Sequence, residues 1–147
     1  MDMNALTKLL TEKKADFEIL NHDKPIYTLS DASLYFDVAY AVPNLILNTD
    51  KGFYSLLISG SRGRADLDSL KEILHCSSVT LANKKQVMDQ TGYKPGELPL
   101  IGLSIPYVFD RLLLQHPFVY GGLGNPLSTL KINPYDLKKL IQPIAEI

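Results

Sequence analysis

Apolar residues along this chain either recur every three to four residues or form short extended runs. Segments of these two kinds alternate from one end of the chain to the other. Spacings of three and four residues predict helices that begin near Asn4, Thr28, Asp66, Asn83 and Asn133. All five residues are of types that cap a helix N-terminus with a side-chain oxygen. Thr28 also has Asp31 three residues later, as in a capping box. The sequence therefore predicts five helices, each with a defined start.

Extended apolar runs predict the strands. Residues 44–49 and 53–59 flank Asp-Lys-Gly at 50–52, a spacing and composition typical of a β-hairpin. Shorter strands are predicted at residues 17–20, 79–82, 106–109, 118–121 and 129–132. Because strands and helices interleave around a hairpin, we predict an α+β fold with a mixed sheet, and one domain over residues 1–147.

Composition changes this picture little. The chain has 147 residues, of which 46% are hydrophobic and 21% charged, as is ordinary for a globular domain. Its apolar runs fall well short of the roughly 20 residues of a membrane span, so no membrane partner is expected. The first residues lack the pattern of a secretory signal, and we expect a cytoplasmic protein.

The distribution of charge argues against nucleic-acid duplexes as partners. Net charge is -1, from 15 basic and 16 acidic residues, and the basic residues are scattered along the chain. Duplex binding depends largely on neutralising phosphates, so we expect no DNA duplex partner. Contact with the end of a single strand is compatible with this charge.

Several kinds of catalytic or metal site have no sequence support. The three histidines include no pair four residues apart, so no metal site is predicted. Cys76 adjoins His75, but side chains of adjacent residues diverge, and we interpret this cysteine as structural. The nucleophile elbow and the phosphate-binding loop motif are absent, and nothing in the sequence indicates a cofactor.

Glycine-rich and basic segments supply the candidate binding residues. TGYKPGELPLIGL at residues 91–103 is a loop constrained by proline and glycine, and GGLGNP at 121–126 favours a nest of backbone N–H groups. Arg62 and Arg64 are suited to clamping a phosphate, and His22 to lining a pocket. For each of these, an ordinary turn or a solvated side chain is the alternative, and the residues alone do not decide.

Taken in order, these segments resemble the YbaK and prolyl-tRNA-synthetase-associated domain family, whose members deacylate mischarged aminoacyl-tRNA. The resemblance covers nearly the whole chain and rests on FEILNHDKP, VPNLILNTDKGFYSLLISGSRGRADLDSL, TGYKPGELPLIGL, IPYVFDRLL and VYGGLGNPLSTLKINPYDLKKL. It implies a partly barrel-like mixed sheet surrounded by helices. It also implies a pocket for the amino acid esterified to the terminal adenosine of tRNA.

The resemblance also implies which residues form that pocket. The substrate-binding residues would be His22, Pro43, Asn44, Arg62, Arg64, Gly96, Leu100, Gly102, Gly121, Gly122, Gly124 and Asn125. Two positions depart from the family pattern. Pro43 stands where the family has a lysine that positions the scissile ester, and Leu100 stands where its ligand loop ends in proline, with Pro99 one position earlier.

The missing lysine leaves the catalytic residue unassigned and two functions open. Asn44, Lys51 or Lys94 are candidates to replace it. The first function is a trans-editing deacylase that binds the aminoacylated 3′ end of tRNA, with an aminoacyl-tRNA synthetase as a further candidate partner. The second is a catalytically silent pocket protein that binds an amino acid or an aminoacyl-nucleoside. A scaffold that contacts another protein is the third and least specific alternative.

Overall fold

Five α-helices form where the apolar spacing predicts them. The computed structural model describes residues 1–147, with α1 (Met3–Glu12), α2 (Leu29–Ala32), α3 (Leu67–Leu74), α4 (Lys84–Thr91) and α5 (Pro134–Ile141). The predicted caps Thr28, Asp66, Asn83 and Asn133 each accept a hydrogen bond from a backbone N–H of the first turn.

The first two helices differ in how well their predicted starts hold. The first begins at Met3 because the side chain of Asp2, rather than Asn4, accepts from the N–H of Ala5. The second has the predicted capping box but ends at Ala32. None of the helices combines the length and the apolar character needed to cross a bilayer.

Eight strands form two sheets. They are β1 (Phe17–Asn21), β2 (Asn44–Thr49), β3 (Gly52–Leu57), β4 (Val79–Leu81), β5 (Tyr107–Phe109), β6 (Val119–Gly122), β7 (Ser128–Ile132) and β8 (Ala145–Glu146). One sheet is mixed, in the order β4-β2-β3-β5-β8, and the other is antiparallel, in the order β1-β7-β6. The antiparallel pairing of β2 with β3 confirms the hairpin, and the α+β prediction is confirmed with it. The short β8 was not predicted.

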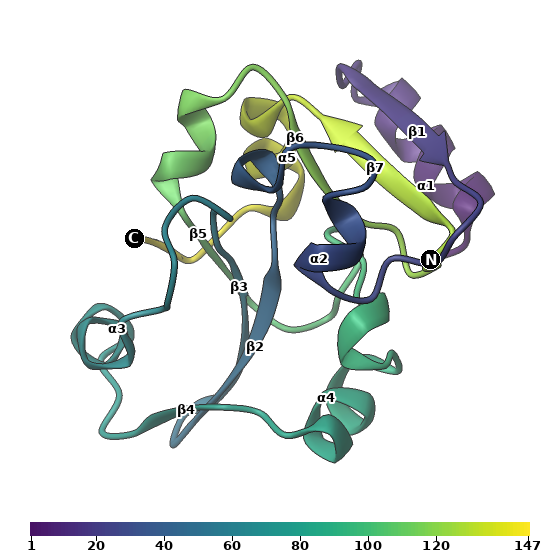
Figure 1. Cartoon of the computed structure of the whole chain (residues 1–147). Coiled ribbons are helices and arrows are strands. Elements are labelled where there is room, and N and C mark those ends of the chain that lie inside the picture. The colour runs from purple at the N-terminus through teal and green to yellow at the C-terminus, as the bar shows by residue number, and fades with distance from the viewer.

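The two sheets meet at one point. A parallel bridge joins Ala41 to Tyr120, and the N–H of Val42 donates to the Tyr120 carbonyl at 2.8 Å. Figure 1 shows the hairpin of β2 and β3 running through the centre of the molecule, with α2 between it and the strands β6 and β7. This junction brings the start of β2 close to the glycine-rich end of β6.

Alternating residues of the hairpin divide the core. Leu47 packs in a cluster with Leu70 and Leu74 of α3, whereas Ile46 packs with Val87 of α4. The two helices therefore cover opposite faces of β2, as side-chain alternation along a strand requires. The largest cluster joins α1 and α5 to the three-stranded sheet and to β3 and β5 of the mixed sheet. Packing on both faces fixes the hairpin, and with it the residues at the start of β2.

Candidate functional site

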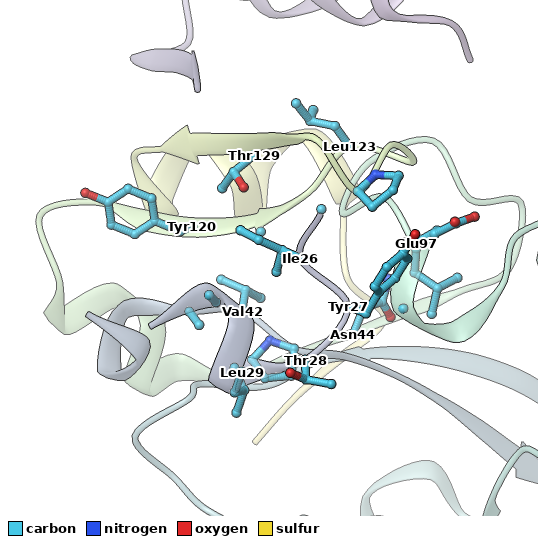
Figure 2. Close-up of a pocket in the computed structure, with 18 of the residues that line it drawn as sticks. Ile26, Tyr27, Thr28, Leu29, Val42, Asn44, Glu97, Tyr120, Leu123 and Thr129 are labelled. Atoms are coloured by element: carbon cyan, nitrogen blue, oxygen red, sulfur yellow. The ribbon is translucent and has the colours of Figure 1, made fainter. Parts of the chain in front are cut away.

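A cavity of about 350 Å³ lies where the two sheets meet. Five short segments supply most of its lining, residues 26–29, 41–45, 95–98, 120–126 and 128–129. Figure 2 shows Tyr27 and Glu97 on one side of it, Tyr120 on the opposite side, and Ile26 and Val42 between them. Segments from distant parts of the chain thus converge on one concave surface.

Seven of the residues proposed from the sequence line this cavity, namely Pro43, Asn44, Gly96, Gly121, Gly122, Gly124 and Asn125. They come from the start of β2, from the 3-10 turn Pro95–Glu97 and from the end of β6 with the turn after it. The structure therefore brings together the two glycine-rich segments and Pro43 at the start of β2.

The glycines at the end of β6 allow the two loops to touch. A Cβ atom on Gly122 would lie 2.1 Å from the carbonyl oxygen of Leu98, and one on Gly121 would lie 2.3 Å from Cδ1 of Leu100. The N–H of Leu100 also donates to the Gly122 carbonyl at 3.0 Å. Leu100 is fully buried behind the lining, where it supports Gly121 and Gly122.

Asn44 ties the cavity wall to the mixed sheet. Its Nδ2 donates to the carbonyl of Pro99 at 3.1 Å, and its Oδ1 accepts from the hydroxyl of Ser55 at 2.6 Å. Ser55 is fully buried on the neighbouring strand β3. The Asn44 amide therefore holds the loop in position, and both of its ends are engaged.

Three backbone donors in the lining have no protein partner. The N–H groups of Gly96, Gly124 and Asn125 donate no hydrogen bond within the protein, and all three residues are at least partly exposed. Unpaired backbone N–H groups in a concave loop favour an anion or a carbonyl oxygen. These groups are free to bind a ligand oxygen.

His22 lies behind the lining and reaches the cavity through Thr129. The carbonyl of Lys24 lies 2.7 Å from Nδ1, so Nδ1 carries the proton of the neutral ring. Nε2 lies 3.1 Å from the Thr129 hydroxyl, which must then be the donor. Thr129 lines the cavity, and its oxygen keeps its lone pairs for a further partner.

The lining contains one charged side chain, the carboxylate of Glu97, and no lysine, arginine or histidine. Pro43, which the resemblance aligns with a lysine, contributes no donor from its pyrrolidine ring. Nowhere in the structure do three or more His, Cys, Asp or Glu side chains gather closely enough to hold a metal ion. The ligand groups of the cavity are therefore mainly backbone amides, hydroxyls and apolar surface.

Arg62 points to a different partner. Its guanidinium donates twice to the buried carboxylate of Asp110, from Nε at 2.8 Å and from Nη2 at 2.7 Å. Burial favours a raised pKa for Asp110, but the bonds from Arg62 and from the N–H groups of Ser59 and Leu112 outweigh it and lower that pKa. The structure thus places Arg62 outside the cavity lining, as the surface partner of the buried Asp110 carboxylate.

The neighbouring Arg64 is exposed and takes part in no ion pair. Neither arginine lines the cavity, so the structure does not bring these residues to the glycine loops. Arg64 keeps a free guanidinium for a phosphate, whereas Arg62 already has its partner.

Comparison with known proteins settles the family. A family model described as "Aminoacyl-tRNA editing domain" matches residues 23–140. The chain belongs to the aminoacyl-tRNA editing domain family. The match includes all the segments that line the cavity.

Solved structures have the fold of this editing domain. The hypothetical protein APE2540 superposes with a TM-score of 0.86 at 28% identity, over 96% of either chain. A proposed trans-editing enzyme for prolyl tRNA synthetase gives a TM-score of 0.80 at 22% identity, over 99% of this chain and 96% of that one. The latter likeness supports the fold.

Gly102 lies apart from the other glycines of this editing domain. It lines a second cavity of about 460 Å³, together with Met1 and Tyr107. That cavity is larger, but Gly102 is the one residue among the proposed site residues that lines it. We therefore take the first cavity as the candidate site.

The lining residues that were not proposed from the sequence include Tyr27, Glu97 and Thr129. Tyr27 and Glu97 are each adjacent to a residue that the patterns did identify, Thr28 and Gly96. A search for polar or aromatic neighbours of caps and glycine turns would have found both. Thr129 gave no such signal, because it sits in an ordinary strand and meets His22 across 107 positions of the chain.

Proposed function

We propose that this editing domain is an aminoacyl-tRNA deacylase that acts in trans on mischarged tRNA. The aminoacylated 3′ end would enter the cavity, and the ester between amino acid and ribose would be hydrolysed there. The observation that carries this proposal is the set of unpaired backbone N–H groups at Gly96, Gly124 and Asn125 on facing loops. An aminoacyl-tRNA synthetase is a further partner under this proposal, and the cytoplasm its location.

The chemistry requires little beyond these groups. Water attacks the ester carbonyl, the bond to the ribose oxygen breaks, and that oxygen takes a proton as the amino acid leaves. Negative charge develops on the carbonyl oxygen, and backbone N–H groups fixed in place stabilise it. One such donor is worth about 10² to 10³ in rate.

Thr129 and His22 are suited to holding the attacking water. The Thr129 hydroxyl donates to His22, so its oxygen is able to accept a hydrogen bond from water in the cavity, and Nε2 of His22 is a base one hydrogen bond beyond it. Thr129→Val keeps the shape but removes the hydroxyl, and we expect a loss of about 10² in kcat. Thr129→Ser should keep most of the rate. Equal rates for the valine variant and the wild type would remove this role.

The charge of the lining favours an esterified amino acid over a free one. An ester keeps the α-ammonium group but has no carboxylate, and the lining offers the Glu97 carboxylate but no cation. A free amino acid would bring a carboxylate without a charged partner, whose desolvation is costly. The same difference favours release of the product.

A second function has one observation in its favour. With Pro43 at the lysine position and no cation in the lining, the cavity has lost the charge that positions the ester in the family. A silent module that binds an aminoacyl-nucleoside would need only the loops. Two lysines were candidates to replace the missing one. Lys51 follows the far end of β2, about 20 Å along the strand from Asn44. Lys94 directly precedes the lining residue Pro95.

The deciding experiment measures release of amino acid from a panel of misacylated tRNAs. The proposed deacylase releases amino acid from at least one member, faster than spontaneous hydrolysis. Release from none of them contradicts the enzymatic function. Pro43→Lys then separates the two functions, because a silent module with an intact framework should gain activity, whereas a deacylase that works without lysine should change little.

A further inference from the structure

One aromatic ring of the cavity has an open face. Three aromatic residues line the cavity, and two of them, Phe36 and Tyr120, stack on each other with ring centroids 4.4 Å apart. The third, Tyr27, pairs with no aromatic ring and is 53% exposed. Tyr27 therefore stands at the mouth, half in the cavity and half in solvent.

The backbone under this ring is fixed on both sides. The N–H of Tyr27 donates to Oδ2 of Asp31 at 3.0 Å, and the N–H of Ile26 donates to the Pro126 carbonyl at 2.8 Å. Gly96 packs so closely that a Cβ there would lie 3.2 Å from the Tyr27 carbonyl oxygen. A ring on such a backbone costs little ordering entropy when a ligand binds.

The surroundings suit a flat, uncharged group. Leu29, Pro95 and Pro126 line the cavity on the same segments as Tyr27 or beside them, and the lining contains no cation for a phosphate. An aromatic face binds nucleobases by stacking, with about 1 to 3 kcal/mol per base.

We propose that Tyr27 is the platform on which the terminal adenine of the tRNA 3′ end stacks. This inference rests on the proposed function, because it takes the aminoacyl group to be inside the cavity. The ribose joins that group to the adenine, so the base must lie just outside, where the exposed half of Tyr27 stands. Tyr27 thereby binds the adenine, while the glycine loops bind the ester.

The test compares ligands with and without the base. The probes are 3′-aminoacylamino-3′-deoxyadenosines carrying alanyl, seryl or prolyl groups, and the matching 3′-aminoacylamino sugars that lack adenine. Their amide bond resists hydrolysis. Tyr27→Ala should weaken binding of the adenosine probes about ten- to a hundredfold, the loss of one stack. Binding of the sugars without base should not change.

Three further variants sharpen the result. Tyr27→Phe keeps the ring and should bind within about twofold of the wild type, whereas Tyr27→Leu, of similar bulk, should lose affinity as the alanine variant does. Tyr135→Ala removes an equally exposed tyrosine from α5, outside the lining, and should have no effect.

Two outcomes overturn the proposal while leaving the deacylase intact. One is an adenosine probe that binds Tyr27→Ala as tightly as the wild type. The other is an equal loss for the sugars without base, which would make Tyr27 a contact of the amino acid. If the wild type binds none of the probes and no aminoacyl-tRNA, the proposed function itself fails, and this inference fails with it.

Discussion

Two turns that look alike in the sequence have opposite roles in the structure. Residues 60–64 and residues 121–125 both combine glycine with polar groups suited to an anion. In the first turn, Arg62 is bound by Asp110, which lies 48 positions away in the chain. In the second, the N–H groups of Gly124 and Asn125 have no protein partner. A turn can bind a ligand only with the groups that the fold leaves unpaired.

The largest expected effect comes from breaking the paired turn. Asp110→Ala removes a buried carboxylate that accepts from Arg62, Ser59 and Leu112. Because the buried N–H of Ser59 and the half-buried N–H of Leu112 would lose their acceptor, we expect the free energy of unfolding to fall by about 3 kcal/mol, measured by urea denaturation.

The two arginines of this turn provide the control. Arg62→Ala should cost less than Asp110→Ala but clearly more than Arg64→Ala, since Arg64 has no ion pair and should stay within about 0.5 kcal/mol of the wild type. Equal stability of the Arg62 and Arg64 variants would show that the ion pair does not hold the turn.

Substitution of Gly122 is expected to lower the stability nearly as much. Gly122→Ala places a Cβ 2.1 Å from the backbone oxygen of Leu98, so the two loops must separate. We expect a loss of about 2 kcal/mol in unfolding free energy, and weaker binding of the adenosine probes in the same titrations.

Gly121 gives a matched comparison, because its Cβ would meet the Leu100 side chain rather than a backbone. A side chain yields more easily, so Gly121→Ala should cost less than Gly122→Ala. In a Leu100→Ala background the cost of Gly121→Ala should vanish, which a double-mutant cycle measures. A persistent cost would mean that another contact requires the glycine.

Substitution of Asn44, at the start of β2, is expected to lower the stability by a smaller amount. Asn44→Ala leaves the buried Ser55 hydroxyl and the Pro99 carbonyl without their partner. We expect about 1 to 2 kcal/mol less stability, together with weaker probe binding because the loop loses its tie. Asn48→Ala on the same strand removes a side chain without such bonds and is the control. The account is contradicted if both variants behave alike.

The smallest expected effect is on how the free energy of unfolding depends on pH in acid. The pKa of Asp110 is lower in the folded protein than its ordinary value, so its contribution to stability is complete above the unfolded value near 3.9. That contribution is lost as the pH falls from there through the lower folded pKa. Unfolding free energy measured from pH 6 to pH 2 should therefore fall less steeply in Asp110→Asn than in the wild type. Parallel curves would contradict the pairing.

Local signals predicted most of the fold. Caps such as Asn83 and the Asp-Lys-Gly turn act within a few residues, so their effect can be read from the sequence. The separation into two sheets and the short β8 depend on pairing between distant segments, which no local pattern encodes.

The candidate site also has features that the sequence predicted and features that only the fold shows. Glycine chemistry made the two loops candidates, and the resemblance made them pocket walls. Both loops line the cavity, where close backbone approach demands glycine at Gly121 and Gly122. The partners of Arg62 and His22 lie far along the chain, at Asp110 and Thr129, and only the folded structure reveals them. Tyr27 escaped notice because exposure, rather than residue type, sets it apart.

The most direct test of the central claim is a crystal structure with a bound 3′-alanylamino-3′-deoxyadenosine. We expect the alanyl group in the cavity, its carbonyl oxygen against the N–H groups of Gly96, Gly124 or Asn125, and the adenine on Tyr27. An analogue bound at Arg64, or in the second cavity beside Gly102, would contradict the assignment of the site.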